Sequence, residues 1–175
     1  MSQTIEAWSH LSDKLIGTIR RDLAPVLGQG QITQTQAIAL ATHTSAIDGP
    51  APTFKKPNGT KASDDEIRET RQVILPILKG MERLGTGVSL GAYDTKTIYC
   101  LGRSRFISTY EYFENYINLL RTSEDNNVNQ PSAYSEAEML KLRLEAMNEK
   151  ATRRRINTRI ITIENTRNAP RRIST

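Results

Sequence analysis

Apolar residues recur every three or four positions in four separate segments of this chain, and this spacing constrains its fold more than any other feature. Side chains three or four residues apart share one face of an α-helix, whereas a half-buried strand alternates every second residue. The pattern therefore predicts an all-α helical bundle, with minor β elements elsewhere. The four stripes are Ile5, Trp8, Leu11, Leu15, Ile19 and Leu23; Ile67, Ile74, Ile77, Met81 and Leu84; Phe106, Tyr110, Phe113, Ile117 and Leu120; and Ala137, Leu140, Leu144, Met147 and Ala151.

Local signals predict where several helices begin and end. A hydroxyl residue followed three positions later by Glu or Gln forms a capping box, and three such pairs occur at Thr33–Gln36, Ser63–Glu66 and Ser135–Glu138. Pro76 should kink or split the second striped helix, because proline lacks the amide that a helix interior uses. The glycine-rich residues 85–103 favour minor β structure rather than helix.

Two polar stretches divide the chain. Residues 48–62 combine three prolines, two glycines and three lysines and predict a long loop, and residues 122–134 predict a linker. We therefore expect a helical body over residues 1–121, the linker 122–134, and a C-terminal helix with an arginine-rich arm over 135–175. The β-branched run at 160–163 is compatible with a strand, a continued helix or an edge that pairs with a neighbour.

The positive charge of the chain is concentrated at its C-terminal end. The chain has a net charge of +5, whereas residues 151–175 alone hold seven arginines and one acid, Glu164, for a net +6. Such asymmetry favours an anionic partner, most often a nucleic acid, although a basic segment can also serve only solubility. The absence of lysine among these basic residues favours phosphate recognition, because the planar guanidinium binds phosphate oxygens in pairs.

The sequence carries no recognisable catalytic or metal-binding motif. The two histidines, His10 and His43, lie in different segments, and Cys100 is the single cysteine. The glycines of residues 85–91 lack the lysine of a phosphate-binding loop and follow a helix rather than a strand. No stretch approaches the roughly 18 apolar residues of a membrane span. We therefore expect no enzyme activity, cofactor, small-molecule substrate or membrane partner.

One short segment resembles a known family. Residues 90–96, Leu-Gly-Ala-Tyr-Asp-Thr-Lys, are similar to a segment of tobamovirus coat proteins, and Trp8 begins a helix much as a tryptophan does in rod-shaped plant virus coats. The resemblance implies a helical bundle whose copies stack around a spiral of RNA. It also implies that Lys96 contacts RNA phosphate and that Asp94 belongs to the same RNA-facing segment. At Ile98, where the family has a second arginine, the chain differs.

Together these features predict a capsid or nucleocapsid protein of a helical plant virus, which assembles in many copies around single-stranded RNA and resides in the virion and the host cytoplasm. The alternative is a non-enzymatic architectural or adaptor subunit of a phage or ribonucleoprotein assembly, which would bind its partner through the 137–151 stripe. The predicted nucleic-acid-binding residues are Asp94, Lys96, Arg103, Arg105, Arg153, Arg154, Arg155 and Arg159.

Overall fold

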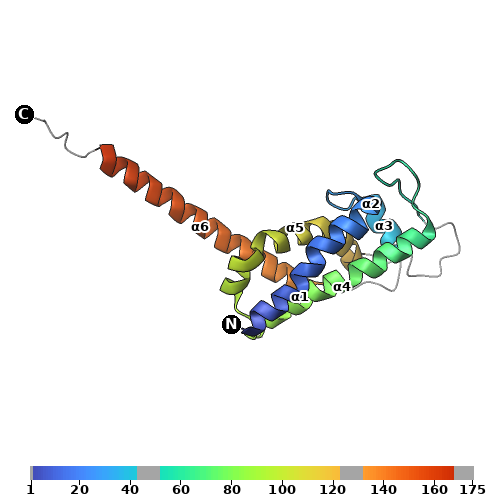
Figure 1. Cartoon of the computed structure of the whole chain (residues 1–175), viewed down its shortest axis with the longest axis horizontal. Coiled ribbons are helices and arrows are strands. Elements are labelled where there is room, and N and C mark those ends of the chain that lie inside the picture. Colours follow the sequence, from blue (N-terminus) through green and yellow to red (C-terminus); the bar gives the residue numbers. More distant parts are fainter. Residues whose placement is uncertain (1, 43–51, 123–131, 168–175) are drawn as a thin grey trace, which may run out of the picture.

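The computed structural model describes residues 2–42, 52–122 and 132–167, which form six α-helices and one π-helical segment. Five helices and the start of the sixth pack into a body, and the rest of the sixth projects away from it (Figure 1). The prediction of an all-α fold is confirmed. The elements are α1 (Ser2–Thr18), η1 (Ile19–Leu23), α2 (Ala24–Leu27), α3 (Gln34–Thr42), α4 (Asp64–Ser89), α5 (Thr95–Thr122) and α6 (Ser135–Arg167).

The predicted apolar stripes form the core of the body. Every member of the α4 stripe and of the aromatic α5 stripe is buried. In the α1 stripe Ile5 is exposed and Thr4 is buried instead, so the buried face is rotated slightly at the start of that helix. Helix α5 packs against α1, α3 and α6, and α4 contacts the same three helices, so α1, α3 and α6 each bridge α4 and α5.

The helical path that α1 begins runs beyond its last residue, Thr18. It continues through the π-helical turn η1 into the short helix α2, which holds Pro25 in its first turn. The helical path then ends at Gly28, which adopts a φ of 92° that side chains disfavour. The capping box predicted at Thr33 and Gln36 is confirmed by both reciprocal hydrogen bonds, 3.3 and 2.8 Å long.

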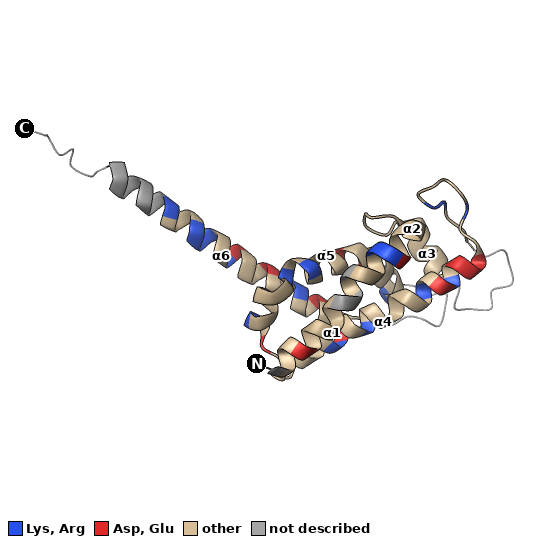
Figure 2. Cartoon of the chain, viewed as in Figure 1, with Lys and Arg blue, Asp and Glu red and all other residues tan. Residues whose placement is uncertain are grey.

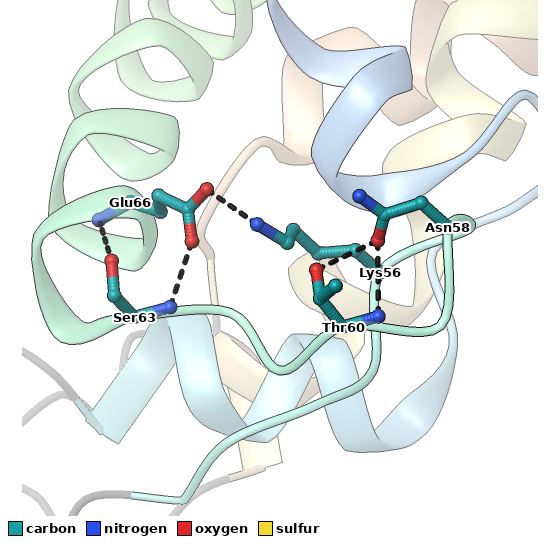
Figure 3. Close-up of polar contacts among 5 residues, drawn as sticks. All are labelled: Lys56, Asn58, Thr60, Ser63 and Glu66. Atoms are coloured by element: carbon teal, nitrogen blue, oxygen red, sulfur yellow. Dashed lines mark hydrogen bonds and ion pairs between the residues drawn. The ribbon is translucent and has the colours of Figure 1, made fainter.

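The described part of the predicted loop, residues 52–62, folds back on itself before α4. Lys55 and Lys61 form an isolated antiparallel bridge, which is the β pairing present among the described residues; no strand forms there. The predicted capping box of Ser63 and Glu66 closes the start of α4, and Glu66 also accepts a 2.7 Å hydrogen bond from Lys56 (Figure 3). The lysine therefore ties this loop to the helix that follows.

The segment 85–103 is mainly helical, which corrects the prediction of β structure there. Helix α4 continues through Pro76 to Ser89, and α5 begins at Thr95. The glycines at 85 and 87 lie where the main chain of α6 and the Tyr93 ring pack directly on α4, so they serve close packing rather than a turn. Similarly, Gly102 interrupts the helical dihedral angles of α5 where the Trp8 ring packs against it.

The start of α6 is capped by a residue far away in the sequence. The main-chain amides of Glu136 and Ala137 donate to the Glu82 carboxylate of α4 at 3.3 and 2.9 Å. This corrects the predicted Ser135–Glu138 capping box, because Glu138 instead pairs with Arg121 of α5 at 2.7 Å. A carboxylate at the positive end of a helix dipole is stabilising, so Glu82 fixes α6 onto the body.

The fourth apolar stripe, in residues 137–151, packs against the rest of the same chain. Ala137, Leu140 and Leu144 are buried against the body, which corrects the idea that the 137–151 stripe is free to bind a partner. Among the described side chains of α6 the last buried one is Leu144, every side chain from Thr152 to Arg159 is exposed, and the helix projects away from the body (Figure 1). Residues 160–163, whose conformation the sequence left open, continue the helix.

Candidate nucleic-acid interface

The projecting part of α6 presents a dense group of positive charges. Residues 150–159, here called the arm, contain five basic residues and no acid. All five basic side chains are exposed, and Figure 2 shows them as bands on the helix beyond the body. The structure thus brings together four residues predicted from the sequence and adds Lys150. The five are Lys150, Arg153, Arg154, Arg155 and Arg159.

These charges have little compensation within the described part of the chain. Arg153 and Glu149 form one ion pair at 4.0 Å between two well-exposed side chains, a type of contact that contributes little. None of the other ion pairs between described residues includes Arg154, Arg155 or Arg159. An anion from outside therefore meets guanidinium groups that keep their hydrogen-bonding capacity.

Helix stability alone does not account for this arrangement. Basic residues favour a helix end through its dipole, but the effect is confined to about the last turn, and Arg153–Arg155 lie three turns before Arg167. Arg155 and Arg159 are four residues apart, so their like charges repel across one turn by about 0.2–0.5 kcal/mol. An external anion would relieve this repulsion.

The pairing of α5 with α6 brings further basic residues to the same end of the body. Arg121 contacts Glu138, whereas Lys141, one turn further along α6, lies 3.9 Å from Glu114, further back along α5. The two helices are therefore antiparallel, and the first part of α5 lies at the end of the body from which the arm projects (Figure 1).

Arg103 and Arg105 of α5 have different surroundings. Arg103 is half-buried and stacks on the Tyr99 ring at 4.5 Å, which fixes its guanidinium by a cation–π contact. Arg105 is exposed and lines a shallow groove together with Arg20, from the π-helical turn. Arg20 was not predicted, because only the packing of α1 against α5 places it beside Arg105.

Asp94 has a clear structural role. Its carboxylate accepts hydrogen bonds from the Thr97 hydroxyl at 2.5 Å and the Thr97 amide at 2.8 Å, and so caps the start of α5. These bonds, that of the hydroxyl first, hold the pKa of Asp94 below its usual range. Lys96 is exposed beside this cap. Asp94 directly precedes α5 and Lys96 lies in its first turn, and contact of either residue with RNA stays a prediction.

Tyr112, an aromatic residue of α5 that lies off the apolar stripe, is buried. Its side chain is 6% exposed, and its hydroxyl donates to the Gly28 carbonyl at 2.9 Å. Burial raises the pKa of Tyr112 to about 12. Its ring contacts Phe113 edge to face, so Tyr112 is a core residue that fastens α5 to the turn after α2.

The described residues contain neither a metal-binding cluster nor a membrane-spanning helix. No group of three or more His, Cys, Asp or Glu side chains in them is placed to hold a metal ion. Cys100 is exposed, and His43 lies outside the described residues. Among the helices described, none is both long enough and apolar enough to cross a membrane.

The fold and the arm together define a helical protein with a projecting basic helix. A family model described as "Domain of unknown function (DUF4760)" matches residues 30–144, about two thirds of the chain, so the chain belongs to this family. The match includes most of the body and ends before the arm. No curated protein and no solved structure matches the chain. The resemblance of residues 90–96 to coat proteins therefore stays a prediction.

Proposed function

We propose that this protein is a non-enzymatic structural protein that binds the phosphate backbone of a nucleic acid through the arm. The observation that carries the proposal is the exposed, acid-free run of basic residues on a helix that projects from the body. Phosphate contacts require cations and are largely independent of base sequence. Arg103 and Arg105 would extend the contact surface towards the body.

The proposal is tested by fluorescence anisotropy with a labelled single-stranded RNA of mixed sequence, over a range of salt concentrations. The logarithm of the binding constant should fall linearly with that of the salt concentration, with a slope of about 0.7 for each neutralised phosphate of a single strand. In Arg154→Gln/Arg155→Gln/Arg159→Gln the slope should fall by about 2, because three phosphate contacts are lost.

A matched control changes lysines of the loop before α4. Lys55 and Lys61 are exposed there, so Lys55→Gln/Lys61→Gln removes charge without disturbing the core. Arg154→Gln/Arg155→Gln should weaken RNA binding strongly, whereas the lysine variant should bind as the wild type does. Equal losses of RNA affinity in the two double variants would mean that binding depends only on the net charge of the protein, and would contradict a role for the arm. A single-stranded DNA of the same sequence shows whether the strand must be RNA.

The narrower form of the proposal is a helical coat protein that self-assembles around single-stranded viral RNA, in the virion and the host cytoplasm. It is supported by the resemblance of residues 90–96 and by a basic helix that projects from the body. Negative-stain electron microscopy of the purified protein, with absorbance at 260 and 280 nm before and after nuclease treatment, tests it. Long uniform rods with protected nucleic acid support a coat protein. Small particles of fixed size with a protein-only spectrum refute it and favour an adaptor subunit.

A further inference from the structure

A pocket between α1 and α4 has the features of a site for a small organic anion. It has a volume of about 500 Å³ and lies between α1 and α4, next to the turn that precedes α5. Pockets of about 300–1,000 Å³ are typical of small-ligand sites. The lining residues are Ala7, His10, Leu11, Pro76, Lys79, Gly80, Arg83, Leu84 and Tyr93.

The pocket exists because small side chains occupy the place where the two helices approach each other. At Gly80 an added Cβ would lie 2.8 Å from the Leu11 side chain, so α1 and α4 nearly touch there. Beside this contact Ala7 and Pro76 contribute little side-chain volume. Tyr93 closes one end of the pocket, where its ring packs on Gly87 of α4. Three separate parts of the chain therefore build the walls.

The polar residues of the pocket are cationic or able to donate hydrogen bonds. Lys79 and Arg83 are one turn apart on α4, and His10 lines the pocket from α1. None of the lining residues is acidic. The ion pairs between described residues include neither Lys79 nor Arg83, although two like charges one turn apart repel each other.

The apolar residues of the pocket would contact an apolar group of a ligand. Leu11, Leu84, Pro76 and the Tyr93 ring give the pocket apolar walls beside the cationic rim. Ligand sites combine apolar walls with a few placed polar groups, and this pocket presents both kinds of surface. A guanidinium and an ammonium together suit a phosphate group, the first by its planar pair of donors and the second as a point charge.

From this arrangement we propose that the α1–α4 pocket binds a small organic phosphate, a phosphate monoester with a compact apolar or aromatic group. The phosphate lies among Lys79, Arg83 and His10, and the apolar group packs against Leu11 and Tyr93. The site is separate from the arm and does not depend on the proposed nucleic-acid function.

The test is a titration of the full-length protein with phenyl phosphate, followed by calorimetry and by amide chemical shifts. Inorganic phosphate and phenol are titrated in parallel. The first has only the anionic group of the proposed ligand, and the second has only the aromatic ring. Phenyl phosphate should bind more tightly than either and should shift the amide signals of Gly80, Arg83 and Tyr93. Binding no tighter than that of inorganic phosphate, or shifts located elsewhere, overturns the proposal.

Two variants separate this site from general attraction of anions. Lys79→Gln/Arg83→Gln should weaken phenyl phosphate binding by about tenfold or more, as expected for the loss of charge-assisted hydrogen bonds. The matched Lys55→Gln/Lys61→Gln variant and the arm variant Arg154→Gln/Arg155→Gln should bind phenyl phosphate as the wild type does. Equal weakening in all three variants overturns the proposal. Titration with a mixed-sequence RNA that lacks terminal phosphates should leave the amide signals of Gly80 and Tyr93 unchanged. If that RNA displaced phenyl phosphate, the pocket would bind the nucleic acid itself, and the proposal of a separate small-molecule site would be overturned.

Discussion

Gly102 shows how a single residue sets the contact between α1 and α5. An added Cβ there would overlap the Trp8 indole, which is itself 5% exposed and enclosed by the core. Gly102→Ala should therefore lower the free energy of unfolding by about 1–3 kcal/mol, the usual cost of overpacking. Chemical denaturation measures it.

Gly17→Ala is the matched control for this variant. Gly17 lies in α1 and is exposed, with nothing within 4 Å of an added Cβ. Because alanine favours a helix more than glycine does, this variant should be more stable by about 0.5–1 kcal/mol. If Gly102→Ala were as stable as Gly17→Ala, the Trp8 contact would not be as close as described.

Asp94 should give the protein a specific sensitivity to acid. Its pKa is lowered in the folded protein, chiefly by the Thr97 hydroxyl, so the ionised carboxylate stabilises the fold. This contribution is complete above the ordinary aspartate pKa of about 3.9 and is lost as the pH falls through the lower folded value. In Asp94→Asn the free energy of unfolding should consequently fall less between about pH 5 and pH 2.

Thr97→Val is the companion measurement, because it removes the main donor to the carboxylate and leaves the acid in place. Denaturant melts at several pH values should show a reduced acid dependence in both variants. Curves parallel to that of the wild type over the whole range would exclude Asp94 as a source of acid sensitivity.

At the scale of elements, the attachment of α6 depends on Glu82. Its carboxylate receives two amides of the first turn of α6, and a hydrogen bond joins Ser89 to Glu136 nearby. Glu82→Ala should lower the free energy of unfolding by about 0.5–2 kcal/mol, as the loss of a helix cap does. Glu82→Gln should cost less, because an amide oxygen still accepts.

Glu69→Ala provides the control on the same helix, since Glu69 is exposed on α4. It should change stability by less than about 0.5 kcal/mol. Hydrogen exchange locates the effect: amides of the first turns of α6 should lose protection in Glu82→Ala and keep it in Glu69→Ala. Uniform loss of protection throughout the body would contradict a local cap.

The same cap explains which elements the sequence could predict. The α4 stripe and the Ser63–Glu66 box were predictable, because each depends on residues within a few positions of one another. The cap on α6 was not, because it joins Glu82 to amides more than 50 residues away. Likewise, glycine spacing in 85–103 indicated β structure, whereas the structure uses Gly85 and Gly87 to admit neighbours that only the tertiary fold brings there.

The candidate interface, too, has features that the sequence could predict and features that it could not. The arginines of the arm were predictable, because charge density is a local property of the sequence. Their exposure on a projecting helix follows from where the buried stripe ends. Arg20 beside Arg105, and the pocket that Lys79 and Arg83 share with His10, could not be predicted, because each joins two helices whose crossing no sequence pattern specifies.

At the scale of the whole molecule, the body should account for the stability of the fold and the arm for the proposed binding of nucleic acid. The buried residues of α6 end at Leu144, and every side chain from Thr152 to Arg159 is exposed. A chain that ends at Ala151 should therefore unfold at nearly the same temperature as the full-length protein, because exposed helix contributes little core burial. Differential scanning calorimetry measures the unfolding temperature.

The same shortened chain should lose most of its affinity for RNA and most of the salt dependence of binding. The reason is that the chain without its last 24 residues is close to neutral. A matched chain that ends at Arg159 keeps the arm and should keep much of the affinity. If the chain ending at Ala151 melted far below the full-length protein, the projecting helix would have a partner within the fold. If both shortened chains bound RNA equally, the contacts would lie on the body, and Arg20, Arg103 and Arg105 would be the residues to change next.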